Sequence, residues 1–102
     1  MWIVSELTDI KKDHGLFSGI DSLADSTNVG DYLMTSDSLQ NPSSIIQPLA
    51  KDNADKVVIG EMLVNSRTVI VDTNLARTYN IRNSDTNVKK YLINLLKVLS
   101  QE

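Results

Sequence analysis

The sequence predicts an α/β fold: a mixed, largely antiparallel sheet of four or five short strands, packed by a C-terminal amphipathic helix. Three observations indicate this class: two neighbouring β-branched runs, an apolar stripe with helical spacing at the C-terminus, and 41% hydrophobic residues in a chain of 102. The absence of cysteine excludes disulfides and thiolate metal sites. We expect residues 1–102 to form one α/β domain or the C-terminal segment of a larger domain.

The clearest strands are expected at residues 56–63 and 67–74. Both runs are rich in valine and isoleucine, and the polar pair Asn65-Ser66 lies in the connection between them, which is typical of a β-hairpin. The second run is apolar on consecutive residues 69–71, so we expect both of its faces to be covered, as in a central strand.

A helix is expected at the C-terminus, with Ser84 or Asp85 as its N-cap. Its apolar residues recur with a helical period and should face the sheet: Val88, Tyr91, Leu92, Leu95, Leu96 and Leu99. The opposite, polar side should carry Lys89, Lys90, Asn94 and Lys97.

The remaining elements are weaker. Short strands are expected at residues 2–5 and 31–35. Residues 45–50 should form an edge strand or the end of a strand, because Pro48 cannot donate a ladder hydrogen bond. Residues 51–55 should form a polar turn. The rest of the stretch from residue 8 to 44 is rich in Asp, Ser, Thr and Asn, which indicates loops.

Charge and composition exclude several function classes. A net charge of −3 and a pI near 5.0 give no broad basic surface, so we expect no nucleic-acid partner. No apolar run approaches the roughly 20 residues needed to cross a bilayer, so we expect no membrane insertion. The glycines are too dispersed for a phosphate-binding loop, and we expect no cofactor. The sequence leaves localisation open.

His14 is the single histidine. One hypothesis makes it a general base oriented by Asp13; the favoured interpretation is a turn histidine whose ring fixes the loop backbone by a hydrogen bond, since sequence neighbours seldom face one another productively.

Asp72 ends the most apolar strand, where α/β folds often place ligands. A strand and acid of this kind also open the metal-dependent nucleases of the PIN type, so Asp72 as a metal ligand is one hypothesis. A cap for the following turn is the other. The nearby arginine fork and phenol ring offer contacts to an anion or a sugar. The weak candidates for ligand binding are therefore Asp72, Asn74, Arg77 and Tyr79, with no catalytic residue and no metal site assigned.

The order of these parts resembles the C-terminal half of class I glutamine-amidotransferase-like domains, which have a flavodoxin-like fold. The resemblance rests on the turn at residues 14–20, the segment 46–50, the strand pair ending at residues 67–74 and the closing helix at 87–99. It implies that the family's nucleophile would lie upstream of Met1, that His14 is structural, and that no family catalytic residue can be placed on this chain.

Together these observations predict a non-catalytic interaction or scaffold domain, belonging to a larger protein or assembly. The expected partner is another protein or a second copy of this chain. The alternative is a small metal-dependent hydrolase or nuclease that uses Asp72, with further acids from a partner subunit.

Overall fold

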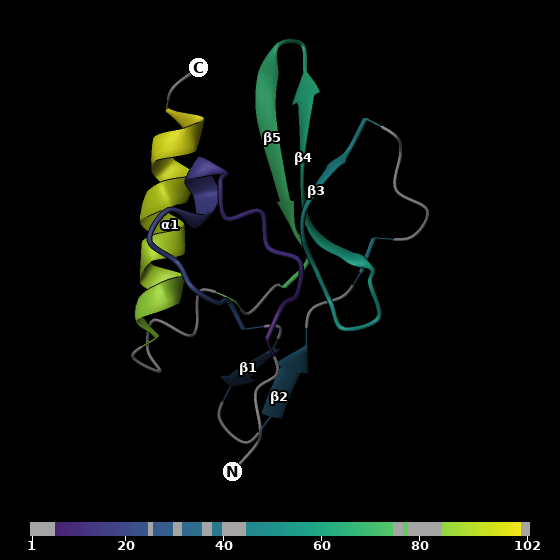
Figure 1. Ribbon diagram of the computed structural model, residues 1–102, viewed down its shortest axis with the longest axis vertical. Coiled ribbons are helices and arrows are strands. Elements are labelled where there is room, and N and C mark those ends of the chain that lie inside the picture. The colour runs from purple at the N-terminus through teal and green to yellow at the C-terminus, as the bar shows by residue number, and fades with distance from the viewer. Residues whose placement is uncertain are drawn as a thin grey trace.

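The computed structural model describes residues 6–24, 26–29, 32–35, 38–39, 45–74, 77 and 85–100. Its elements, in chain order, are η1 (Gly15–Phe17), β1 (Ser26–Val29), β2 (Tyr32–Thr35), β3 (Gln47–Lys51), β4 (Val57–Val64), β5 (Arg67–Asp72) and α1 (Thr86–Leu99). Antiparallel strands and one C-terminal helix confirm the predicted α/β class (Figure 1). The strand expected at residues 2–5 lies outside the described residues.

The described strands form two antiparallel sheets, β1–β2 and β3–β4–β5, where the sequence predicts one. The strand expected at 31–35 is confirmed as β2. Its partner β1 was missed, because the run Ser26–Val29 has almost no apolar content and was interpreted as loop.

β4 and β5 form the predicted hairpin, in register from Val64↔Arg67 at the turn to Ile59↔Asp72. The loop is two residues long, and Asn65 and Ser66 both have positive φ, at 52° and 65°. A turn with two positive φ angles matches the natural twist of paired strands. The hairpin therefore continues the sheet without distortion.

The expectation that the 67–74 strand is central is wrong. β4 is central and carries the buried run Val57–Gly60, whereas β5 pairs only with β4 among the described strands and has no buried residue. A run of consecutive valines and isoleucines indicates a strand, but it does not distinguish an edge strand from a central one.

β3 lies on the opposite edge of this sheet, as Pro48 predicts. The polar turn after it is also confirmed. Asp52 Oδ1 accepts hydrogen bonds from the backbone N–H groups of Ala54 and Lys56, at 2.9 and 3.0 Å, so this side chain takes the place of a backbone acceptor in the turn.

The core draws heavily on the N-terminal stretch that was interpreted as loops. Its buried members are Leu7, Leu16, Phe17, Ile20, Leu23, Leu49, Ala50, Val58, Ile59, Val88 and Tyr91. Phe17 and Tyr91 stack with ring centroids 6.2 Å apart. The chain around η1 thus fills the space between α1 and the three-stranded sheet (Figure 1).

α1 begins as expected. Asp85 is its N-cap, and its carboxylate accepts hydrogen bonds from the N–H groups of Asn87 and Val88. The helix packs chiefly against η1: Asn94 Nδ2 donates to Leu16 O at 3.1 Å and to Ser18 O at 2.9 Å.

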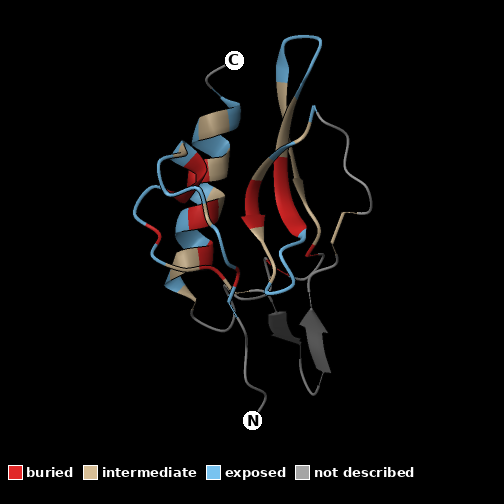
Figure 2. Cartoon of the chain, turned by 45° about the vertical axis from the view of Figure 1, so that its right-hand side comes forward, coloured by how far each residue is buried: buried red, intermediate tan, exposed pale blue. Residues whose placement is uncertain are grey.

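This contact corrects the predicted orientation of α1. Asn94, expected on the polar side, is buried, whereas Leu96 and Leu99, expected in the core, are 71% and 38% exposed. Figure 2 shows buried, intermediate and exposed residues alternating along α1. The carbonyl groups of η1 need donors, and Asn94 supplies them. The helix is rotated accordingly, and the apolar side chains of its C-terminal half remain in contact with solvent.

Candidate functional site

A groove between β5 and α1 is the candidate functional site. The two elements run in opposite directions, so the C-terminal end of α1 lies at the same end of the molecule as the β4–β5 turn (Figure 1). The groove holds a cavity of about 180 Å³. Its lining residues are Ile70, Asp72, Asn74, Arg77, Tyr91, Leu92 and Leu95.

Asp72 organises one end of this groove. Its Oδ2 accepts hydrogen bonds from Arg77 Nε at 2.5 Å and from the Tyr91 hydroxyl at 2.9 Å. Its Oδ1 accepts from Arg77 Nη2 at 3.1 Å and from the Asn74 N–H at 3.0 Å. Both carboxylate oxygens are therefore already shared among groups of the protein itself.

Arg77 is the buried cation of this network. Its side chain is only 3% exposed, it donates from Nη1 to Ala24 O at 2.6 Å, and its guanidinium carbon lies 5.8 Å from the centre of the Tyr91 ring. Such a position for a charge is stable only with a counter-ion and satisfied donors. Asp72 and Ala24 provide both.

Tyr91 completes the network from α1. Burial, and then the charge of Asp72, raise the pKa of its hydroxyl above the ordinary value, and Arg77 offsets only part of that rise. The hydroxyl stays protonated and acts as a hydrogen-bond donor, which is the role its contact with Asp72 requires.

Three of the four predicted site residues therefore meet: Asp72, Asn74 and Arg77 lie together at the end of β5. Tyr79 lies outside the described residues. Asp72 accepts a hydrogen bond from the N–H of Asn74 in the turn after β5. This contact agrees with the interpretation of Asp72 as a cap for that turn. Tyr91 is a further member of the site, although the sequence pattern indicates only a core position for it. A phenol within an apolar stripe is the signal that could have identified it, since its hydroxyl needs a partner when buried.

The apolar part of the groove lies next to this network. Ile70 from β5 and Leu92 and Leu95 from α1 are each partly buried, and they pack against the edge of the core. Leu96, Ile93 and Leu99 continue the apolar surface along the exposed side of α1.

β5 contributes the side chains of Ile70 and Asp72 to the groove. Thr73 N–H donates to Val58 O, which extends the β4–β5 ladder by one pair. Bonded and non-bonded pairs alternate in an antiparallel ladder, so the Ile70↔Glu61 pair is non-bonded. The N–H and C=O of Ile70 therefore point away from β4, and no other described strand pairs with this edge.

His14 occupies a separate place, between η1 and β4. Its Nδ1 accepts a hydrogen bond from the Leu16 N–H at 3.0 Å, which caps η1, and its Nε2 lies 3.0 Å from Glu61 Oε2. This geometry matches the turn-histidine interpretation. The carboxylate beside the ring belongs to Glu61, so the suggested orientation by Asp13 is wrong.

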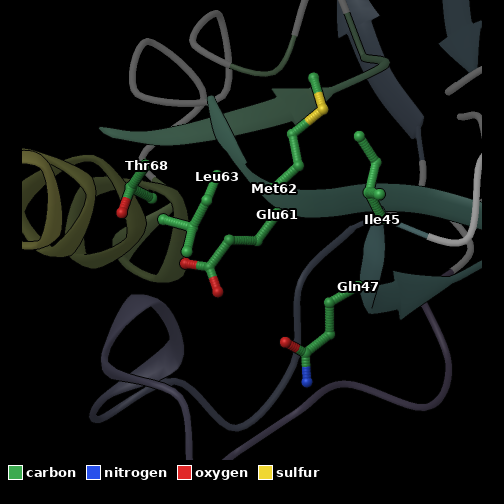
Figure 3. Close-up of a pocket in the computed structure, with 6 residues that line it drawn as sticks. All are labelled: Ile45, Gln47, Glu61, Met62, Leu63 and Thr68. Atoms are coloured by element: carbon green, nitrogen blue, oxygen red, sulfur yellow. The ribbon is translucent and has the colours of Figure 1, made fainter. Parts of the chain in front are cut away.

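A larger hollow of about 400 Å³ lies beside β4, but its side chains do not converge. Figure 3 shows Met62 and Ile45 pointing to one side of the sheet, whereas Glu61, Leu63 and Gln47 point to the other. Groups on opposite faces cannot act on one ligand, so this hollow is a weaker candidate than the groove.

Two further findings concern the described part of the chain. No three of its histidine, aspartate and glutamate side chains gather as a metal site would require. Nor does it contain a helix of the length and apolarity that a membrane crossing needs.

Comparisons with known proteins identify no relative: no protein-family model, curated protein or solved structure matches this chain. The resemblance to class I glutamine-amidotransferase-like domains stays a prediction.

Proposed function

We propose that this chain is a non-catalytic interaction domain that binds a protein partner in the groove between β5 and α1. The observation that carries the proposal is the pairing of every described ionisable group in the groove. Asp72, Arg77 and Tyr91 satisfy one another, so the surface left for a partner is apolar: Ile70, Leu92 and Leu95.

The size of the cavity also favours a side chain over a small-molecule substrate. Sites for substrates and cofactors usually enclose roughly 300–1,000 Å³. The groove's cavity of about 180 Å³ is smaller. The helix α1, which lines one side of it, also carries the exposed apolar residues Ile93, Leu96 and Leu99. An exposed apolar surface next to a shallow cavity is typical of a protein-binding surface.

Selection of random linear peptides against the folded chain tests this proposal directly. We expect bound peptides that compete with one another for one site. A parallel turnover screen against esters, phosphoesters and glutamine should give no activity that Asp72→Ala or His14→Ala abolishes. Activity lost in either variant would overturn the non-catalytic assignment.

The alternative, a metal-dependent hydrolase using Asp72, requires that carboxylate to bind Mg²⁺ or Mn²⁺. It would have to give up its contacts with Arg77, Tyr91 and the Asn74 N–H. A rise in melting temperature on adding either ion, lost in Asp72→Asn, would support the alternative.

A further inference from the structure

We propose that η1 is a pH-sensitive turn: uptake of a second proton by the His14 ring removes the hydrogen bond that caps η1, and the turn opens. The inference goes beyond the proposed function, because neither His14 nor its partner Glu61 lines the groove between β5 and α1. It follows from the contacts of the two ring nitrogens and from the burial of Leu16.

The contacts of the His14 ring determine which nitrogen carries the proton of its neutral form. Nδ1 lies 3.0 Å from the backbone nitrogen of Leu16, whose N–H is a donor, so Nδ1 is the acceptor and carries no proton. Nε2 lies 3.0 Å from Glu61 Oε2, and a carboxylate oxygen accepts. The proton of the neutral ring is therefore on Nε2. A ring turned over about its Cβ–Cγ bond would place carbon atoms against both partners.

A second proton affects the two ring contacts differently. It binds at Nδ1, the ring nitrogen that has no proton in the neutral form. The Nε2–H still donates to Glu61, and this hydrogen bond becomes an ion pair. The contact with Leu16 is lost, because the Nδ1–H and the backbone N–H are then both donors. Of the two contacts, protonation therefore removes only the cap of η1.

The burial of Leu16 makes the loss of the cap costly. Leu16 is 0% exposed, so water cannot take the place of Nδ1 as the acceptor while η1 stays closed. A buried N–H without an acceptor is unfavourable. The turn therefore opens at its N-terminal end, where the Leu16 N–H can then bind water.

The charged groups near the ring come from two segments. Glu61 of β4 is its direct partner. Lys11 and Asp13, from the segment before η1, line a hollow of about 190 Å³ beside the ring, to which β3 contributes only uncharged side chains. On the other side of η1, the helix α1 contributes Asn94 and Val98, whose side chains do not titrate. Histidine is the side chain that ordinarily changes its charge between about pH 5 and 8.

Opening of η1 reaches α1 through Asn94. The side-chain amide of Asn94 donates to Leu16 O at 3.1 Å and to Ser18 O at 2.9 Å, so both of its acceptors belong to the turn or to its C-cap. Lys90 of the same helix donates to Gly19 O at 3.1 Å, and this contact does not involve the ring. The amide of Asn94 therefore reports the opening of the turn from the side of the helix.

A pH titration of the isotope-labelled chain, followed by NMR, tests the inference. At about pH 8 the ring nitrogen shifts of His14 should show the proton on Nε2. Between about pH 8 and about pH 5.5 we expect the second proton to bind at Nδ1. The protection of the Leu16 amide against hydrogen exchange should then fall by about tenfold. The side-chain amide of Asn94 should shift with the same midpoint.

The variant His14→Asn is the matched control. Its amide oxygen can accept from the Leu16 N–H but takes up no proton in this range, and Lys11, Asp13 and Glu61 remain in place. We expect constant protection of Leu16 in this variant.

Four results would overturn the inference. They are a proton on Nδ1 at about pH 8, a ring that is still neutral at about pH 5.5, protection of Leu16 that does not follow the charge of the ring, and an equal fall in His14→Asn. None of them bears on peptide binding in the groove, so the proposed function stands or fails separately.

Discussion

The hydroxyl of Tyr91 on α1 donates a hydrogen bond of 2.9 Å to Asp72 Oδ2 at the end of β5. This contact joins the helix to the edge strand. Arg77 also donates to Asp72, and its guanidinium carbon lies 5.8 Å from the centre of the Tyr91 ring. The contact between Tyr91 and Asp72 fixes one end of the groove.

The raised pKa of Tyr91 predicts a loss of stability at high pH. In the unfolded chain the phenol ionises near its ordinary pKa of about 10, but burial and Asp72 keep it protonated in the fold. Its contribution is therefore complete below that pH and falls above it, by up to about 1.4 kcal/mol per pH unit. Urea unfolding of the wild type and of Tyr91→Phe between about pH 9 and about pH 11 should show the steeper decline in the wild type. Equal slopes would contradict the assignment.

Asp72→Asn should destabilise the fold by on the order of 3 kcal/mol, because Arg77 would keep its charge in a buried position without a counter-ion. The double variant Asp72→Asn with Arg77→Gln should recover part of that loss. Denaturant unfolding of the wild type, Asp72→Asn, Arg77→Gln and the double variant measures the coupling free energy between the two side chains. Additive losses would show that the two side chains do not act as a pair.

Asn94→Leu should also destabilise, although it places an apolar residue at a buried helix position. The carbonyl groups of Leu16 and Ser18 would lose their donor, at a cost of roughly 1–3 kcal/mol. Thermal unfolding checks this, with Ile93→Asn as the exposed control on the same helix, for which we expect a small change. A more stable Asn94→Leu would mean that the packing of α1 on η1 does not depend on these bonds.

His14→Ala should cost about 1 kcal/mol through loss of the η1 cap. His14→Asn should recover much of this, since a short amide oxygen can accept from the Leu16 N–H in place of the ring nitrogen. Chemical denaturation of both variants gives the comparison. If the two are equally destabilised, the contact of the ring with Glu61 matters more than the cap.

The fold class and the hairpin could be predicted because they depend on local patterns. Four features each favour one local backbone conformation: the β-branched runs, the Asn65-Ser66 connection, Pro48 and the Asp85 cap. Neither β1 nor the core residues around η1 could be predicted, because the first half of the chain is polar. Its single apolar residues lie between polar ones and show neither a helical nor a strand period.

The groove could be predicted only in part. The position of Asp72 at a strand end brought it, Asn74 and Arg77 into the candidate set. The role of Tyr91 and the exposure of Leu96 depend on the rotation of α1, which the carbonyl groups of η1 determine. A stripe of apolar residues indicates only roughly which side of a helix faces the core. Polar contacts with distant segments then determine the rotation of the helix about its axis.

The most direct test of the groove as the binding surface is the affinity of the selected peptides for two matched variants. Leu96 is 71% exposed beside the groove and Ile45 is 65% exposed near β3, so Leu96→Glu and Ile45→Glu make the same chemical change at two separate surfaces. We predict that Leu96→Glu weakens binding by about tenfold or more, whereas Ile45→Glu leaves it unchanged. Unchanged affinity in Leu96→Glu, or an equal loss in both variants, would contradict the account.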